Sequence, residues 1–290
     1  MKKISLGVIA LLFCLTFTFA QEKEKDTSYW AKTGKIIFLF NQSAFSNWVA
    51  GGDNNLAGNI SLNYDFNYKK NNFIWNNKVI ASYGLTKSQN TDFPKKTSDG
   101  INYNSMFGID ADRNWFYSVL VNFKTQFTKG YKYTKDENGK EIRTEHTDFM
   151  SPGYLLIGPG MLWEKSKDFK FNLAPATIKF VFVDKDRTLP NSKYFGVEEG
   201  ESIRFELGFS ASLFYKFKLM ENVTMENILA FYSNYLDNPQ NIDLNYRMNI
   251  DMSINKYLSA NFIFHTIYDD NAFKGFQVRE VFGIGVNYIF

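Results

Sequence analysis

The clearest indication of the fold comes from the last stretch of the sequence, Glu280-Val281-Phe282-Gly283-Ile284-Gly285-Val286-Asn287-Tyr288-Ile289-Phe290. Large apolar side chains occupy every second position from Phe282 to Phe290, and the positions between them hold mostly glycine or asparagine. Successive side chains of a β-strand point to opposite faces of the strand. The spacing therefore predicts a terminal strand with one apolar face and one face of small or polar groups.

An amphipathic strand that ends in a carboxy-terminal Phe resembles the closing strand of outer-membrane β-barrels. The resemblance implies that the last strand completes a barrel and that the barrel assembly machinery recognises Phe290. It also implies that the protein resides in the outer membrane of a Gram-negative cell.

The same alternation recurs along the rest of the chain. Residues 242–254 show it most clearly, because apolar side chains such as Leu244 and Tyr246 alternate with polar ones such as Asp243 and Arg247. A helical period would mix the two sets, so the pattern favours strands. We expect about twelve of them in an all-β, antiparallel transmembrane barrel. They are predicted at residues 35–41, 58–69, 75–85, 101–110, 115–127, 154–164, 169–183, 203–217, 223–235, 242–254 and 258–268 and in the terminal stretch.

The connectors between these strands alternate between short and long. This asymmetry is typical of outer-membrane barrels, which have short periplasmic turns and longer outer loops. Both termini then lie on the periplasmic side, and the terminal strand must pair with residues 35–41 to close the sheet. The long connectors are predicted near residues 43–55, 88–98, 129–150, 184–200, 236–241 and 269–276.

The start of the chain has the layout of an export signal. A basic Met1-Lys2-Lys3 precedes the apolar residues 4–19, and the sequence turns polar after Ala20. We therefore predict a cleaved signal peptide at 1–20, a flexible lead at 21–33 and a single barrel domain at 34–290. The only cysteine, Cys14, lies inside the signal, so the mature chain would have no disulfide. A lipoprotein signal is the disfavoured alternative, because the bulky Phe13 precedes that cysteine.

Composition agrees with a membrane barrel. Hydrophobic residues make up 44% of the chain and aromatic residues 18%, yet no apolar run approaches the roughly 20 residues that a membrane helix needs. The net charge is only +3, which gives no electrostatic case for binding nucleic acid. The expected partners are outer-membrane lipids and lipopolysaccharide, and we expect a monomer. A soluble β-sandwich would also show alternating strands, but it would not explain the signal, the terminal Phe and the connector pattern together.

The predicted inward face carries charges of both signs. An ion-selective pore would be expected to carry one dominant sign. Two interpretations remain open: ion pairs that fill a narrow barrel, and a narrow path for a small solute. The inward charged positions are Asp65, Lys78, Asp110, Lys124, Arg204, Glu206, Lys216, Glu226, Arg247 and Asp251.

Signals for catalysis or for metal binding are weak. His265 has inward parity, and Ser253 and Asp251 lie on the neighbouring predicted strand, so a lipid hydrolase with a Ser/His pair is one alternative. That chemistry needs the nucleophile within hydrogen-bond reach of its base, and the spacing does not show this. Acidic residues in the loops match no calcium-loop spacing. We therefore expect no enzymatic activity, no catalytic residue, no metal and no cofactor.

Residues 44–55, 233–243 and 254–261 resemble a family of exported Bacteroidota proteins whose domain has no assigned function. The resemblance implies an outer-membrane barrel and assigns no activity. The function expected is passage or binding of a small solute, and the alternative is a structural or surface-interaction barrel with a filled lumen. Candidate ligand-binding residues come from the first long loop and from the lumen: Phe45, Trp48, Asp53, Lys78, Lys124, Arg204, Arg247 and His265.

Overall fold

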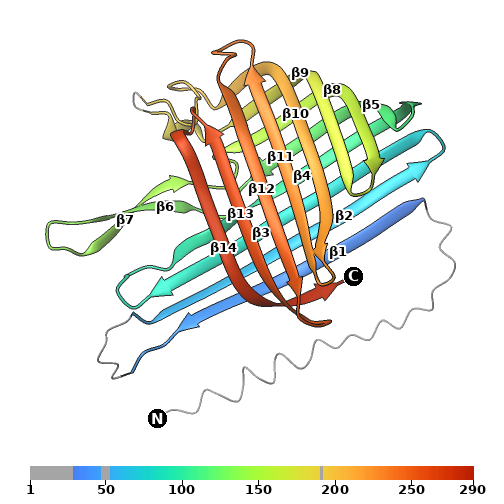
Figure 1. Cartoon of the computed structure of the whole chain (residues 1–290). Coiled ribbons are helices and arrows are strands. Elements are labelled where there is room, and N and C mark those ends of the chain that lie inside the picture. The colour runs from blue at the N-terminus through green and yellow to red at the C-terminus, as the bar shows by residue number, and fades with distance from the viewer. Residues whose placement is uncertain (1–28, 47–52, 190–191) are drawn as a thin grey trace.

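The structure, a computed structural model, describes residues 29–46, 53–189 and 192–290. In this part of the chain twelve antiparallel strands form a closed barrel, as the alternation predicts (Figure 1). The predicted signal peptide lies outside the described residues. The barrel strands are β1 (Trp30–Ser43), β2 (Asn55–Lys70), β3 (Phe73–Ser88), β4 (Lys95–Asp112), β5 (Trp115–Thr125), β8 (Gly153–Ser166), β9 (Phe169–Phe182), β10 (Ile203–Met220), β11 (Val223–Asn234), β12 (Ile242–Ser253), β13 (Leu258–Asp269) and β14 (Phe273–Ile289).

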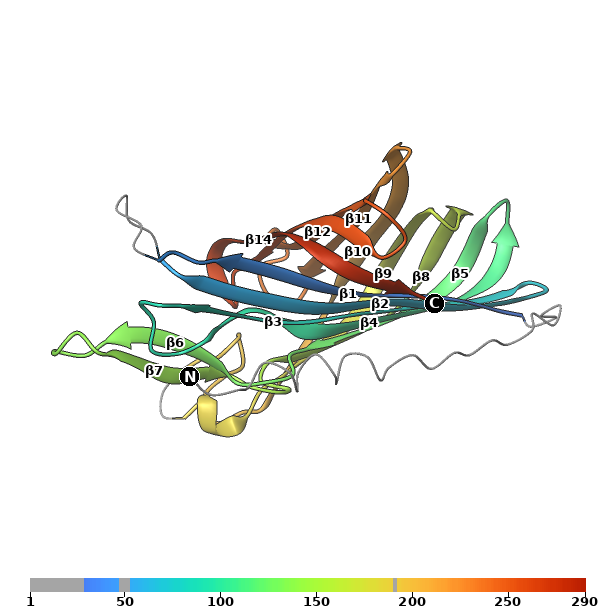
Figure 2. The same ribbon diagram turned by 90° about the horizontal axis from the view of Figure 1, so that it is seen from below.

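Several element boundaries differ from the predictions. β1 begins at Trp30, so the barrel includes the end of the lead that was expected to be flexible up to residue 33. The predicted loop at 129–150 contains a two-stranded sheet of β6 (Gly130–Lys135) and β7 (Glu141–Thr147). This hairpin extends away from the barrel wall at the end that carries the long loops (Figures 1 and 2). The sequence carries no clear signal for this hairpin, because short strands outside the barrel have no lipid-facing row of apolar side chains.

The barrel closes where the sequence places the closure. β14 pairs with β1 from Lys35 opposite Ile289 to Phe40 opposite Ile284. Beyond the Lys35–Ile289 pair, the backbone of Phe290 exchanges hydrogen bonds of 2.7 and 2.9 Å with Gly34. The terminal residue therefore belongs to the closing ladder.

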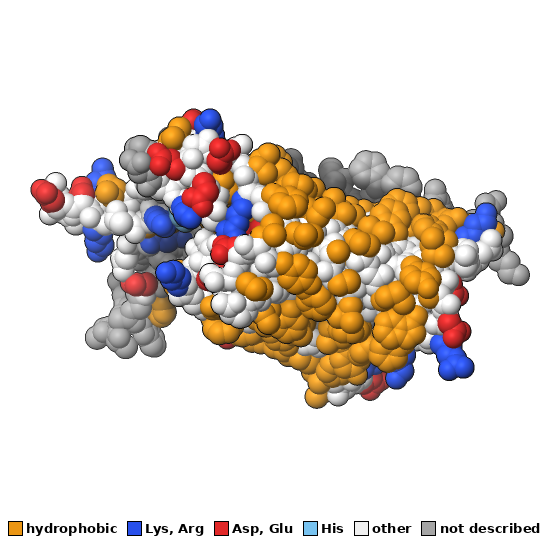
Figure 3. Space-filling model, turned by 90° about the horizontal axis from the view of Figure 1, so that it is seen from above, with side chains coloured by type: hydrophobic (Ala, Val, Ile, Leu, Met, Phe, Trp, Pro, Cys, Tyr) orange, Lys and Arg blue, Asp and Glu red, His pale blue; other side chains and the backbone are white. Residues whose placement is uncertain are grey.

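The apolar side chains face outward and the polar ones face the lumen. Phe282, Ile284 and Val286 are more than half exposed on the exterior, whereas Asn287, on the opposite face of β14, is buried. Figure 3 shows a broad apolar surface over the barrel wall, with charged side chains gathered toward the ends. This inverted distribution suits a barrel surrounded by lipid.

No helix in the described residues is long and apolar enough to cross a membrane.

Two small apolar clusters lie inside the barrel. One consists of Ile74, Phe116 and Leu162, with Met106 against it, close to the short turns. The other lies near the long loops and consists of Val181, Val183 and Val197, packed against Tyr154, Tyr194 and Phe195. The space between the two clusters is mostly polar and contains the candidate site.

Candidate functional site in the barrel lumen

Two cavities occupy the lumen, one above the other. The outer chamber, toward the long loops, has a volume of about 410 Å³, and the inner chamber, toward the short turns, has about 350 Å³. Three residues line both chambers: Asn104, Leu120 and Ser212. The boundary that they mark between the chambers is called the waist below. The outer chamber is lined by residues that include Asp99, Lys124, Gln126, Tyr154, Lys179, Phe195, Tyr232, Asp243 and Asp269. The inner chamber is lined by residues that include Asp65, Lys78, Lys170, Phe214, Lys216 and Glu226.

The inner chamber is crossed by an ion pair. The Lys78 ammonium on β3 lies 3.2 Å from Asp65 on β2 and 3.5 Å from Glu226 on β11. β3 and β11 are not neighbours in the barrel, so this ammonium joins distant parts of the wall. Lys35 also forms an ion pair with Asp251. The predicted mixed charges therefore include pairs that fill part of the lumen.

The outer chamber has a second ionic network. Lys179 Nζ lies 3.0 Å from Asp243 and 3.5 Å from Glu206, and Arg204 Nε lies 3.2 Å from Glu206. Carboxylate oxygens of Asp243, Asp269 and Asp270 come within 4.8 Å of one another. The Lys179 ammonium supplies positive charge beside this acidic group.

Lys124 differs from Lys179, the other lysine among the described residues that line the outer chamber. Among the described residues, no carboxylate oxygen lies within 4.0 Å of its ammonium. Lys124 sits opposite Tyr154 in the register of β5 and β8, and both line the chamber. Its positive charge is therefore available to an anionic group of a bound molecule.

The connector between β9 and β10 folds over the chamber and forms its roof. Phe195 adopts a positive φ of 51° and Gly196 one of 76°, and this turn brings Phe195 into the chamber lining. Val197 is completely buried. Arg204 donates to Asn271 Oδ1 at 2.6 Å and to the Gly196 carbonyl at 3.4 Å, which ties the roof to the β13–β14 turn. The apolar run from Tyr194 to Val197 in an otherwise polar connector was the available sequence signal.

The roof is docked against the base of the β6–β7 hairpin. The Tyr194 hydroxyl donates to the His146 carbonyl, and the His146 ring packs edge-on against Tyr194 with centroids 5.9 Å apart. Burial lowers the pKa of His146, and the positive charges of Lys132 and Arg187 lower it further. Burial also raises the pKa of Tyr194 to about 12.

Glu145, next to this histidine, binds two cations. Lys129 donates to it at 2.8 Å, and Arg187 forms a further ion pair with it. The Lys129 hydrogen bond holds the pKa of the Glu145 carboxyl below its usual range and raises the pKa of Lys129 itself. The Lys129–Glu145 pair stays charged near neutral pH, and the Arg187–Glu145 pair connects the hairpin to the β9–β10 connector.

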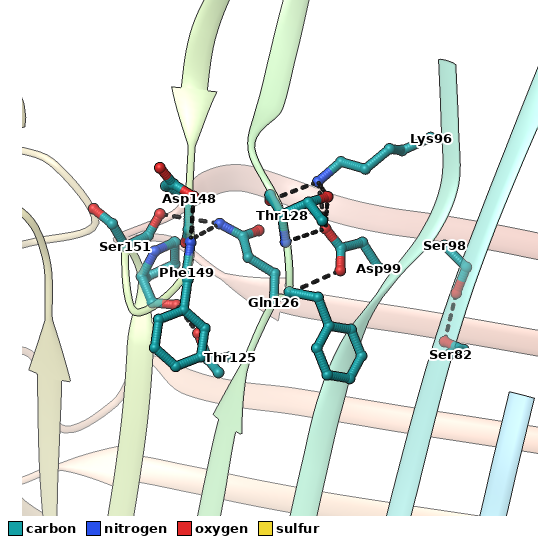
Figure 4. A network of polar contacts seen from close by, with 12 residues as sticks. Ser82, Lys96, Ser98, Asp99, Thr125, Gln126, Thr128, Asp148, Phe149 and Ser151 are labelled. Carbon is teal, nitrogen blue, oxygen red and sulfur yellow. Dashed lines mark hydrogen bonds and ion pairs between the residues drawn. The ribbon is translucent and has the colours of Figure 1, made fainter. Parts of the chain in front are cut away.

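A polar network fixes the rim of the chamber where β5 ends (Figure 4). The Asp99 carboxylate accepts hydrogen bonds from the backbone N–H groups of Phe127 at 2.8 Å and Thr128 at 3.1 Å. It also forms an ion pair with Lys96. Gln126 donates to the carbonyl of Ser151 at 3.1 Å from the other side of the loop. These bonds end β5 at Thr125, two residues before the predicted end, and hold two chamber-lining side chains in place.

The structure brings together only some of the predicted ligand-binding residues. Lys124 lines the outer chamber and Lys78 the inner one, while Arg204 supports the roof. Phe45 and Asp53 lie in the first long loop and line neither chamber. Trp48, from the same loop, lies outside the described residues.

His265 does not meet the residues proposed for a hydrolase. Its register partners are Arg247 on β12 and Arg279 on β14, and Nε2 lies 3.1 Å from Asn245 Oδ1. Asp251 lies four residues beyond Arg247, about 13 Å along the strand at roughly 3.3 Å per residue, and Ser253 lies further still. The register between β12 and β13 therefore keeps both Asp251 and Ser253 away from His265.

Solved structures similar to this chain include the COG4313 outer membrane channel from Pseudomonas putida F1, at 10% identity and a TM-score of 0.38, over 93% of this chain and 99% of that one. The translocator domain of the autotransporter NalP from Neisseria meningitidis is 10% identical, with a TM-score of 0.37 over 89% of this chain and 86% of that one. The CymD monoaromatic hydrocarbon channel is 10% identical, with a TM-score of 0.32 over 90% of this chain and 87% of that one. These similarities are too distant to indicate a function.

No curated protein matches the sequence at a significant level. Residues 40–131, from β1 into β6, match the model of a family described as "Protein of unknown function (DUF3078)". The match confirms a resemblance to a family without an assigned function over this region, which includes the predicted stretch 44–55. The resemblance of residues 233–243 and 254–261 and the Bacteroidota origin stay predictions.

Proposed function

We propose that this protein is an outer-membrane barrel that binds a small solute in the outer chamber and passes it toward the inner chamber. The observation that carries the proposal is the pair of cavities that share Asn104, Leu120 and Ser212. The outer and inner chambers meet at this waist. Together they would form a path of two successive sites through the lumen. The apolar exterior supports placement in the membrane.

The chemistry of the outer chamber suggests the kind of solute. Lys124 offers an unpaired ammonium, and Tyr154 and Phe195 offer aromatic surface close to it. A cavity of about 410 Å³ is within the range of small-molecule sites. A small organic anion with an apolar part matches these groups best.

Single-channel recording in planar bilayers tests the proposal. The wild-type protein should give reproducible conductance steps, and Leu120→Ala should enlarge them because it widens the waist. Lys124→Met should reduce the preference for anions. Lys132→Met on the hairpin is the matched control and should leave selectivity unchanged. A silent wild-type protein together with a silent Leu120→Ala variant would overturn passage through the lumen.

A filled structural barrel is the second candidate, because the Lys78–Glu226 ion pair crosses the inner chamber. It predicts silence in the same bilayer experiment. No enzymatic activity is proposed, since the structure leaves His265 beside two arginines instead of a nucleophile.

The partners and the location belong to the same proposal. Outer-membrane lipids would cover the apolar belt, and lipopolysaccharide would meet the hairpin and loops on the outer side. Nothing in the charge distribution suggests nucleic acid as a partner. A monomer is expected, and light scattering of the detergent complex would measure its mass.

A further inference from the structure

The seam between the first and last strands is only partly closed. β1 and β14 pair from Lys35–Ile289 to Phe40–Ile284, with Gly34 and Phe290 bonded beyond the first of these pairs, but no pair follows Phe40–Ile284 toward the long loops. β1 nevertheless continues to Ser43, where it pairs with Asn55 of β2, and β14 continues back to Phe273, paired with β13. Toward the long loops, each of the two strands therefore has an edge that the other does not cover.

A cavity of about 520 Å³ lies along this unpaired part of the seam. It is lined by residues of both faces of the wall. Asn59 and Arg279 face the lumen, while Phe40, Val278 and Phe282 belong to the lipid-facing row and are about half exposed or more. Because alternate residues of a strand point to opposite faces, a cavity lined by both sets passes through the wall.

An acidic side chain on the lipid-facing side also marks this place. Glu280 alternates with Val278 and Phe282 in the outward row, is exposed, and lines the same cavity. A charged side chain in lipid is costly unless water or polar groups reach it. A hydrated gap between the two strands would provide that environment.

On the lumen side, three basic side chains form a row across neighbouring strands. Arg247 of β12 is the register partner of His265 on β13, and His265 is the partner of Arg279 on β14. Among the described residues, neither arginine has a carboxylate oxygen within 4.0 Å. Arg247 donates to Asn249 at 3.1 Å and Arg279 to the Thr97 carbonyl at 3.3 Å, so both guanidinium groups keep donors free.

We propose that the gap between β1 and β14 is a lateral binding site for a single-chain amphiphile with an acidic head group. The head group binds Arg279 and Arg247 on the lumen side, and the chain runs outward past Phe40 and Phe282 into the membrane. A carboxylate and a phosphate both suit a guanidinium, which binds either with two parallel hydrogen bonds. This site holds whether or not the lumen conducts, so it goes beyond the proposed function.

Binding to the purified barrel in a neutral detergent tests the proposal, with dodecanoate and a lysophosphatidate as probes. Dodecyltrimethylammonium, with a similar chain and the opposite charge, is the control ligand. The acidic amphiphiles should bind and the cationic one should not. If dodecanoate alone binds, the source is a fatty acid; if lysophosphatidate alone binds, it is a phospholipid. Equal binding of all three would overturn the proposal.

Charge variants test the head-group site. Arg279→Met and, separately, Arg247→Met should weaken binding of the acidic probe by about tenfold or more, because each removes a charge-assisted hydrogen bond. Arg279→Lys keeps the charge and should retain part of the affinity, which separates loss of binding from loss of folding. Lys132→Met should bind like the wild type. Unchanged affinity in both Met variants would contradict the site.

A disulfide across the seam tests whether the amphiphile enters between β1 and β14. The mature chain is predicted to lack cysteine, so Asn41→Cys with Gly283→Cys introduces a unique pair of cysteines. These positions line the cavity and would pair next if the β1–β14 ladder continued past Phe40–Ile284. Oxidation should abolish amphiphile binding and reduction should restore it, while lumen conductance stays unchanged. Full binding by the oxidised protein, with the disulfide shown by mass spectrometry, would overturn lateral entry. Loss of conductance alone would bear on the proposed function instead.

Discussion

At the residue scale, Phe290 has a structural role at the barrel closure. Its ring covers Gly34, where any Cβ would collide with the ring atoms. The ring also stacks on Tyr64 and Tyr288 at centroid distances of 5.8 and 5.7 Å. An aromatic side chain that covers a glycine on the adjacent strand fixes the register of the two strands. The terminal Phe thus anchors the seam at its closed end.

This packing makes a matched pair of glycine variants informative. Gly34→Ala should destabilise the barrel by about 1–3 kcal/mol, because the new methyl displaces the Phe290 ring. Gly58→Ala, where no atom lies within 4 Å of the added Cβ, should be close to neutral. Urea unfolding in lipid vesicles measures both. Equal stability of the two variants would show that the ring moves freely.

Phe290→Ala tests the assembly role that the terminal strand implies. We expect less protein inserted into the outer membrane, and the molecules that do insert should keep their lumen conductance. Quantitative blotting of membrane fractions, with Phe273→Ala as the control at the other end of β14, measures the difference. Normal insertion of Phe290→Ala would remove the terminal residue as a recognition signal.

At the element scale, the outer end is shaped by two connectors that bind each other. The β6–β7 hairpin presents His146 and Glu145, and the β9–β10 connector presents Tyr194 and Arg187. Neither element belongs to the barrel wall, yet their contact positions Phe195 over the outer chamber. The position of the roof therefore depends on this docking as well as on the Arg204 hydrogen bonds to Asn271 and Gly196.

The docking should weaken on mild acidification. The folded state lowers the pKa of His146, so the unfolded or undocked state binds more protons below the ordinary value of about 6.5. The stabilisation from the neutral ring is present above that pH and is lost as pH falls below it. Glu145, whose pKa is lowered, stays ionised over this range, Lys129, whose pKa is raised, stays charged, and Tyr194 stays neutral.

Limited proteolysis of the β9–β10 connector measures this effect. Cleavage should accelerate between pH 7.5 and 5.5 in the wild type. His146→Phe keeps a ring against Tyr194 but cannot titrate, so its cleavage rate should change little over the same range. An equal acceleration in both proteins would assign the pH response to another group.

At the scale of the whole molecule, the barrel has an apolar, lipid-facing exterior and an interior in which ion pairs cross the lumen. The Lys78 ammonium links Asp65 and Glu226, which lie on distant parts of the wall. An extracted barrel of this kind should stay soluble only in detergent and should migrate faster on a gel before heating than after. Stable solubility without detergent would contradict the membrane barrel.

The ion pair across the lumen should contribute to this heat resistance. Glu226→Gln leaves Lys78 with one carboxylate partner and should lower the temperature at which the fast-migrating form disappears. The expected loss is about 1–3 kcal/mol, as for a hydrogen bond to a charged group. Glu221→Gln, on an exposed turn, is the control and should not shift the temperature.

The strands and the two faces of the barrel wall could be predicted from the amino-acid pattern alone. Alternation from Phe282 to Phe290, and again along β12, is local: lipid takes one side of a strand and the lumen the other, so each strand carries its own signal. The connector lengths then fixed which strands are joined, and with them the pairing of β14 with residues 35–41.

The contacts between side chains of different strands and loops could be seen only in the three-dimensional structure. The offset between neighbouring strands places Arg247 beside His265 and keeps Asp251 away from it, and no local pattern encodes that offset. The same is true of the roof on the hairpin and of the Lys78–Glu226 pair, which depend on contacts between distant parts of the chain. The chambers and the open seam follow from those long-range contacts, because a lumen exists only once every strand has found its partner.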